Sequence, residues 1–178
     1  GFKIKSSAGA SAPTEMIGAV EKNISRIFET RQVLQIPLEE AIKQGKVDIF
    51  DFDPIYLQRM NNFVDLDHMR KSKLKVIIDS MYGAGSGYFK SLLEGGAIEV
   101  IEINSERNPS FPGINPEPIA VNLKKLSSCI QYERASIGIA TDGDSDRIGI
   151  IDENGKFITQ LEVYALLALY LLEVRQQK

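Results

Sequence analysis

The stretch from 137 to 151, IGIATDGDSDRIGII, places an acidic loop between two short apolar runs. Runs of this length and composition are typical of buried strands. The Asp, Gly and Ser residues between them favour a turn. The stretch therefore predicts two strands joined by a short loop, and the second strand is expected to return antiparallel beside the first.

Apolar patterning upstream of this hairpin predicts more strands and two helices. Strands are expected at 74–78 and 98–103, and helices at 88–94 and from 119 to about 132. The order strand, helix, strand, helix, strand is typical of a parallel sheet with right-handed crossovers. We therefore expect an α/β domain from about 70 to 153, with three α/β/α layers and a mixed, mostly parallel sheet.

The two ends of the chain do not read as domains of their own. Apolar residues at helical spacing predict a helix from about 13 to 29, and another helix follows Pro54. No period dominates between 31 and 53, which indicates a connector. The apolar run at 163–172 is too short to cross a membrane, which takes about 20 residues, and predicts a buried helix. Both ends look like pieces of neighbouring domains.

Composition excludes several classes of protein. The 178 residues carry 21 basic and 24 acidic side chains, a net charge of −3, and no basic block, so a nucleic-acid partner is not expected. A single cysteine, Cys129, forms no intrachain disulfide and indicates a reduced, cytoplasmic protein. With His68 the only histidine, Cys/His zinc sites are excluded within the chain. We expect Cys129 to be partly buried in a helix and His68 to be exposed.

The acidic loop carries the strongest signal for a functional site. Asp142, Asp144 and Asp146 alternate at the end of a strand, the edge where open α/β sheets bind ligands. Three carboxylates so close repel one another unless a cation lies among them, and Mg²⁺ prefers oxygen ligands. Gly143 allows a tight backbone, and the forked guanidinium of Arg147 suits phosphate oxygens. The loop is predicted to bind Mg²⁺.

Two other interpretations of this loop are weaker. A solvated acidic turn is the plain alternative, but the apolar strands on both sides would hold the loop rigidly. In a calcium EF-hand counted from Asp142, Glu153 falls at the twelfth position. The sixth position, however, is Arg147 where the EF-hand requires glycine, and the flanks are strands instead of helices.

A glycine-rich turn at 83–87 follows the first strand and opens a helix, and Glu102 comes about 20 residues later, as in dinucleotide-binding folds. The third glycine of that fingerprint is missing, because Tyr88 occupies its place. We therefore favour a tight strand-to-helix turn in which Ser86 caps the helix. Asp79, at the strand end beside this turn, is a weaker candidate for orienting a loop.

Several stretches together resemble one family. The acidic loop with its strands, 137–149, resembles the metal-binding signature of the α-D-phosphohexomutases, the phosphoglucomutase/phosphomannomutase family. The strand and turn at 76–85 resemble the opening of that family's second domain, although Tyr82 stands where histidine is frequent. The Pro-Glu-Pro loop at 113–118 and the segment at 11–15 are also similar to the family.

The resemblance implies a domain organisation and an activity. It assigns 1–45 to the end of domain I, 46–155 to a complete domain II, and 156–178 to the beginning of domain III. It implies an isomerase-class phosphomutase that moves phosphate between the 1 and 6 positions of a hexose phosphate through a phosphoserine in domain I. It also implies that Asp142, Asp144 and Asp146 hold Mg²⁺ and that Arg147 contacts the phosphate.

The serine motif that the family uses as nucleophile does not occur in these 178 residues. We therefore expect the chain to act as part of a parent protein with domains I, III and IV, and to be inactive alone. The substrate could be a phosphate of glucose, mannose or glucosamine. The alternatives are a non-catalytic nucleotide-binding module built on the glycine turn, or a metal-binding α/β module that keeps the fold without the chemistry.

Overall fold

The computed structural model describes residues 3–31 and 33–177 and divides into two units after Asp51. Unit 1 contains the helices α1 (Thr14–Thr30) and α2 (Leu38–Lys43). Helix α1 begins directly after Pro13, which has no amide hydrogen and so leaves no unpaired donor in front of the first turn. The helix ends at Arg31, whose φ is 52°. This confirms the predicted helix, whereas α2 falls in the segment read as a connector.

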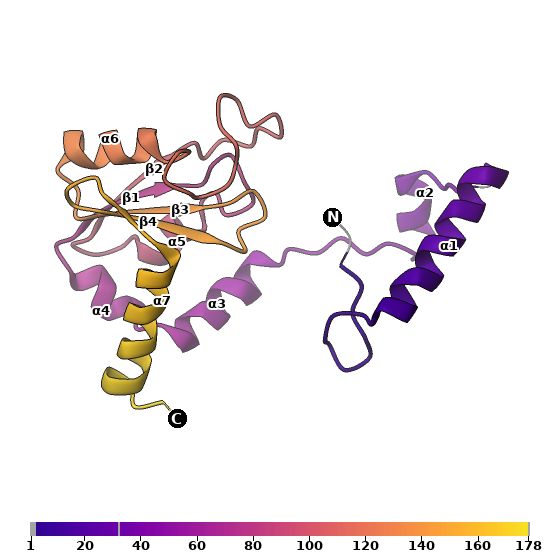
Figure 1. The fold of residues 1–178 in the computed structure, drawn as a ribbon, viewed down its shortest axis with the longest axis horizontal. Helices are drawn as coiled ribbons and strands as arrows, with labels where there is room; N and C mark the ends of the chain where they lie inside the picture. Colours follow the sequence, from indigo (N-terminus) through magenta and orange to yellow (C-terminus); the bar gives the residue numbers. More distant parts are fainter. Residues whose placement is uncertain (1–2, 32, 178) are drawn as a thin grey trace. The chain divides into compact units, whose positions relative to one another are not determined.

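Unit 2 holds the five-stranded sheet and the remaining helices (Figure 1). Its elements in chain order are α3 (Asp53–Phe63), α4 (Leu66–Lys71), β1 (Lys75–Asp79), α5 (Tyr88–Leu93), β2 (Glu99–Ile103), α6 (Lys124–Glu133), β3 (Ile137–Thr141), β4 (Ile148–Asp152), β5 (Phe157–Ile158), α7 (Gln160–Leu169) and a π-helical segment at Tyr170–Val174.

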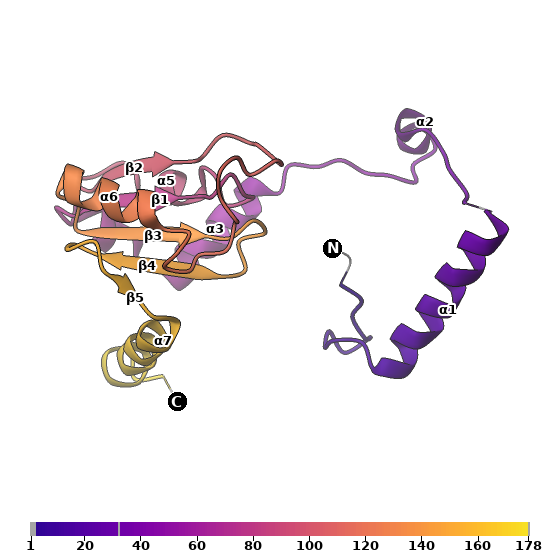
Figure 2. The same cartoon turned by 45° about the horizontal axis from the view of Figure 1, so that its top comes forward.

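The strands lie in the order β2-β1-β3-β4-β5 (Figure 2). Strand β1 pairs in parallel with both β2 and β3, while β4 runs antiparallel to β3 and β5 antiparallel to β4. Four of the five strands therefore point the same way. The predicted α/β class, the mixed and mostly parallel sheet, and the antiparallel return of β4 are confirmed.

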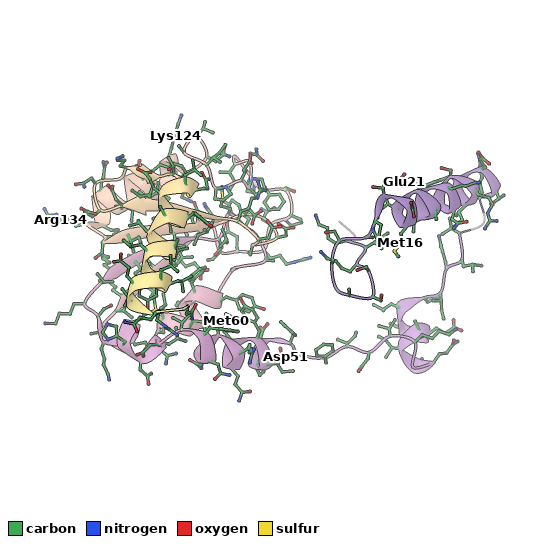
Figure 3. All side chains as sticks on the ribbon, turned by 60° about the horizontal axis from the view of Figure 1, so that its bottom comes forward. Met16, Glu21, Asp51, Met60, Lys124 and Arg134 are labelled. Atoms are coloured by element: carbon green, nitrogen blue, oxygen red, sulfur yellow. The ribbon has the colours of Figure 1, made fainter. Side chains whose placement is uncertain are left out.

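Helices cover both faces of the sheet, because alternate residues of each strand point to opposite sides. On one face, Leu126 and Ile130 of α6 pack against Ile77 of β1 and Ile151 of β4. Figure 3 labels Lys124 and Arg134 at the two ends of this helix. Gly138 lets α6 lie close, since a Cβ there would be 3.0 Å from Leu126 Cγ.

The opposite face is covered by α4 and α5. Val76 and Ile78 of β1 are buried there together with Leu66 of α4 and Leu93 of α5. Full burial of such a side chain contributes about 1.5–3 kcal/mol each, so the two clusters fix the sheet between its helices. The three α/β/α layers that the sequence predicts are present.

Several boundaries differ from the prediction. Helix α6 begins at Lys124 instead of Ile119, because 119–123 form tight turns after Pro118 in which the Asn122 side chain donates to the Glu117 carbonyl at 2.8 Å. Helix α4 was missed, although Asp65 caps it by accepting from the His68 amide at 2.9 Å. Strand β5 was missed as well.

The apolar C-terminal helix corresponds to α7 and the π-helical segment. No described residue of α7 is buried, and Leu161 is 82% exposed. The prediction of a buried helix is therefore wrong for this chain, because the sheet covers α7 along β4 only in part. None of the described helices is both long and apolar enough to cross a membrane. His68 is exposed and Cys129 partly buried, as predicted.

Candidate metal centre

The acidic loop lies at the carboxyl ends of the parallel strands, beside the turn that follows β1. From β1 the chain passes through α5 to β2 on one side of β1, whereas β3, the next strand in the sequence, lies on the other side of β1. This reversal of strand order opens a crevice where α/β proteins bind their ligands. The Ser80–Gly87 turn and the Asp142–Arg147 loop meet at this point.

Asp142, Asp144 and Asp146 converge as the sequence predicts. Each offers one carboxylate oxygen, and the three oxygens lie within 4.8 Å of one another. Mg²⁺ binds oxygens at about 2.0–2.1 Å, so opposite ligands of an octahedron lie roughly 4 Å apart. Three hard oxygens at this spacing fit Mg²⁺ after a small closure. Asp142 is 1% exposed, whereas Asp144 and Asp146 face solvent.

The buried carboxylate of Asp142 is held by Arg147. Its Oδ1 accepts the Arg147 backbone amide at 3.1 Å, and its Oδ2 accepts from Arg147 Nε at 2.9 Å. Burial raises the pKa of Asp142, but these hydrogen bonds and the guanidinium charge outweigh burial and hold that pKa below its ordinary value. Asp142 is therefore ionised at neutral pH, the form that binds a metal ion.

Arg147 connects the loop to a carboxylate outside it. Its Nη1 donates to Glu117 Oε1 at 2.8 Å, and its Nε lies 3.7 Å from Asp146 Oδ1. The hydrogen bond to Asp142 is the main cause that raises the pKa of Arg147, so this side chain stays charged. Its side chain is 54% exposed and can reach a ligand.

Glu117 is not among the site residues that the sequence predicts. The only signal in the sequence is its place between Pro116 and Pro118, in the loop that resembles the family's Pro-Glu-Pro loop. The same loop braces the acidic loop through its backbone, because the Gly143 amide donates to the Pro116 carbonyl at 3.3 Å. The close approach of this loop to β4 also explains why position 149 is glycine, since a Cβ there would lie 2.6 Å from the Pro118 carbonyl oxygen.

The turn after β1 braces the acidic loop from the other side. The Ala84 amide donates to the Gly143 carbonyl at 3.0 Å. Gly83 packs so closely that a Cβ would lie 2.8 Å from the Asp142 carbonyl oxygen and 2.9 Å from Gly143 Cα. This contact explains why the position requires glycine, which the sequence alone attributed only to a tight turn.

The start of α5 differs from the prediction. Ser86 does not cap the helix, and its hydroxyl donates instead to the Ser105 carbonyl. The helix begins after Gly87, which has a φ of 81° and whose amide donates to Glu102 Oε1 at 2.8 Å. Glu102 also accepts from Ser80 Oγ at 2.6 Å. The amide that would face a pyrophosphate in a dinucleotide site is therefore occupied by Glu102.

A cavity of about 460 Å³ opens beside the loop within unit 2. One wall is the loop from Asp144 to Ile148, and the other is aromatic, with Tyr56 of α3 and Tyr88 of α5 in edge contact at 5.4 Å between ring centroids. Thr141 also lines the cavity, and its buried hydroxyl has no hydrogen-bond partner among the described residues. The aromatic wall was not foreseen, because α3 and the loop are far apart in sequence.

The sequence model of the phosphoglucomutase/phosphomannomutase alpha/beta/alpha domain II matches residues 54–155. The chain belongs to the phosphoglucomutase/phosphomannomutase family. It is 36% identical over 169 residues to a "probable phosphoglucosamine mutase" of Methanococcoides burtonii, covering 88% of this chain and 37% of that protein. A phosphoglucomutase/phosphomannomutase of Thermococcus kodakarensis is 37% identical over 113 residues, covering 64% of this chain and 25% of the other.

A solved structure shows the same relationship to the family. A protein of Thermus thermophilus described as a "putative phosphomannomutase" superposes with a TM-score of 0.65 and 35% identity, covering 71% of this chain and 29% of that one. The chain therefore spans between 25% and 37% of the length of these three relatives.

The matched segment, 54–155, contains β1 to β4 and the acidic loop. The division into 1–45, 46–155 and 156–178 stays a prediction, and β5 at Phe157–Ile158 pairs with β4 just beyond residue 155. Asp79, the weaker candidate, is 2% exposed and accepts two hydrogen bonds at the turn beside the loop.

Proposed function

We propose that this chain supplies the metal-holding domain of a phosphohexomutase, an enzyme that interconverts hexose 1-phosphates and hexose 6-phosphates. The observation that carries the proposal is the Asp142, Asp144 and Asp146 cluster, with three carboxylate oxygens within 4.8 Å at the crevice of an α/β sheet. The family relationship supports the same reaction class, since the relatives named above are described as phosphomutases.

Each charged residue of the loop has a role in this proposal. Asp142, Asp144 and Asp146 hold Mg²⁺, which when bound supplies positive charge to the oxygens of the phosphoryl group during transfer. Arg147 donates hydrogen bonds to the same phosphate from its exposed guanidinium. Asp142 keeps Arg147 in place, and Glu117 holds the far end of the guanidinium until the phosphate arrives.

The remaining parts of the reaction lie in the proposed parent protein. There, a phosphoserine of domain I carries the phosphoryl group, and domains III and IV select glucose, mannose or glucosamine phosphate. We place this parent protein in the cytoplasm, without nucleic-acid or membrane partners. The isolated chain is expected to show no mutase activity and to bind Mg²⁺ weakly, because the phosphate ligand is missing and the carboxylates still repel one another.

The alternative nucleotide-binding module is disfavoured by Glu102. Its carboxylate accepts the Gly87 amide at 2.8 Å and adds negative charge at the start of α5. An incoming pyrophosphate would have to displace this carboxylate. No described feature of the glycine turn favours nucleotide binding over the simple bracing role.

A domain exchange tests the proposed function. Residues 54–155 replace the matching segment of the Methanococcoides burtonii relative, and mutase activity is measured with glucose, mannose and glucosamine phosphates. We expect turnover by the chimera and loss of turnover by the same chimera with Asp142→Asn and Asp144→Asn. A folded chimera that binds Mg²⁺ through these residues but turns over no hexose phosphate would refute the proposal.

A further inference from the structure

A buried polar network lies behind the turn that braces the acidic loop. Asp79, at the end of β1, is 2% exposed, and its Oδ1 accepts from the Met81 amide at 2.9 Å and from Asn104 Nδ2 at 2.8 Å. Asn104 is 6% exposed, and its Oδ1 accepts from Lys125 Nζ at 2.6 Å. Leaving a buried carboxylate without hydrogen bonds is costly, so these three hydrogen bonds fix Asp79, Asn104 and the Met81 backbone relative to one another.

The network holds an unfavourable backbone conformation in place. The φ angles of Met81, Tyr82 and Asn104 are 46°, 59° and 48°, in the left-handed region that residues other than glycine rarely adopt. The Tyr82 amide donates to the Asn104 carbonyl at 2.7 Å, which joins the two segments. Conformations of this kind persist only where surrounding interactions require them, and they gather at functional sites.

The turn transmits this geometry to the acidic loop by direct contact. Gly83 follows the two left-handed residues and packs against the backbone of Asp142 and Gly143. Ala84 donates its amide to the Gly143 carbonyl at 3.0 Å. Gly143 lies between Asp142 and Asp144, so a shift of the turn would move two of the three carboxylates relative to each other.

We propose that Asp79, together with Asn104, is a positioning residue for the metal loop. It sets the place of the turn against which the acidic loop rests, although it does not itself touch the metal. The functional role of Asp79 rests on the proposed Mg²⁺ site, but its effect on the position of the turn can be measured without the metal.

Four variants of the 178-residue chain test this role. Asp79→Ala removes both hydrogen bonds, and Asp79→Asn keeps an oxygen that can accept them. Gly83→Ala disturbs the contact between turn and loop directly. Asp152→Ala is the matched control. Asp152 also ends a strand and accepts hydrogen bonds from two backbone amides, at 2.9 and 2.8 Å, but it lies beside the start of β3, at the other end of the strands from the acidic loop.

Two readouts are taken by NMR: hydrogen exchange of the Ala84 amide without metal, and the Mg²⁺ affinity of the loop. We expect Asp79→Ala to speed Ala84 exchange about tenfold or more and to weaken Mg²⁺ binding roughly 10- to 100-fold, as loss of supporting contacts does at other metal sites. Asp79→Asn should recover most of both effects, and Asp152→Ala should change neither.

A folded Asp79→Ala chain with unchanged Ala84 exchange and unchanged Mg²⁺ affinity would overturn the proposal. An equal effect of Asp152→Ala would also overturn it, because the effect would then be general destabilisation. If Asp79→Ala does not fold, Gly83→Ala decides in the same two readouts. If the unmodified chain binds no Mg²⁺, the proposed function fails, while Ala84 exchange still tests the positioning role.

Discussion

Replacing Arg147 by methionine tests the electrostatics of the acidic loop. The change removes the Nε bond to the buried Asp142 carboxylate, at 2.9 Å, and the Nη1 bond to Glu117, at 2.8 Å. A hydrogen bond between charged groups contributes about 1.5–3 kcal/mol. The Arg147 side chain is 54% exposed, so solvent screening lowers this contribution, and the Asp142 bond to the Arg147 backbone amide remains. The Asp142 carboxylate is 1% exposed, and its loss of this partner should lower the free energy of unfolding of Arg147→Met by about 1–2 kcal/mol at pH 7.

The same prediction carries a pH dependence whose sign follows from the pKa of Asp142. That pKa is lowered in the folded state, so the stabilisation is present above the ordinary value of 3.8 and is lost as pH falls through the folded value. The stability gap between the unmodified chain and Arg147→Met should therefore narrow below about pH 4.

Urea unfolding of both chains, followed at several pH values, measures this gap. With a urea dependence of about 2 kcal/mol/M, the middle of the usual range, the midpoint should shift by roughly 0.5–1 M at pH 7. Arg107→Met is the control, because Arg107 is exposed and has no hydrogen bond or ion pair with the described residues. Equal midpoints at pH 7, or a gap that persists unchanged in acid, would refute the electrostatic explanation.

Two further substitutions test other parts of the fold. Gly149→Ala should lower the free energy of unfolding by about 1–3 kcal/mol, because the added Cβ would meet the Pro118 carbonyl at 2.6 Å and Leu123 Cδ1 at 2.9 Å; an unchanged urea midpoint would show that the Pro-Glu-Pro loop does not press on β4. Thr159→Ala should destabilise the start of α7 by about 1 kcal/mol, since Thr159 and Glu162 form a capping box, and hydrogen exchange of the Val163 amide measures the loss. Hydrogen bonds from the Thr159 backbone and side chain lower the pKa of Glu162, so the cap should weaken in the unmodified chain as pH falls below the ordinary value of 4.5. A protection factor of the Val163 amide, corrected for the intrinsic pH dependence of exchange, that stays the same between pH 6 and about 3 would contradict the capping role.

The central part of the fold was predictable because its strands are continuous apolar runs. The apolar residues at 76–78 are buried, and 137–140 is buried or half-buried, so both runs need helices on the two faces of the sheet; Leu74, expected as the start of the first strand, is 47% exposed and precedes β1. Two short elements, α4 and β5, have no such apolar run and could not be predicted. Strand β5 has two residues, too few to establish a period, and the six residues of α4 are mostly polar, with Leu66 the one that is buried. Helix α6 was placed five residues too early, because Val121 and Leu123 continue its spacing although Pro118 and the turns after it delay the helix.

The candidate site was predictable only as far as its residues are close in sequence. The three aspartates and Arg147 lie within six residues, so their spacing alone indicated a shared cation. Glu117 reaches Arg147 from 30 residues away, and Glu102 reaches Gly87 from a neighbouring strand. Partners of this kind depend on the register of the sheet, which no local pattern encodes, and for that reason Ser86 was chosen wrongly as the cap.

Titration of the 178-residue chain with Mg²⁺, followed by amide NMR shifts, tests the central claim most directly. We expect the shifts to centre on Thr141–Arg147 and to disappear when Asp144 and Asp146 are both replaced by asparagine. Calcium should bind the same residues, because it shares the preference for carboxylate oxygens. Shifts confined to the Gly83–Gly87 turn, with none at Asp142–Asp146, would contradict the assignment of this loop as the metal site.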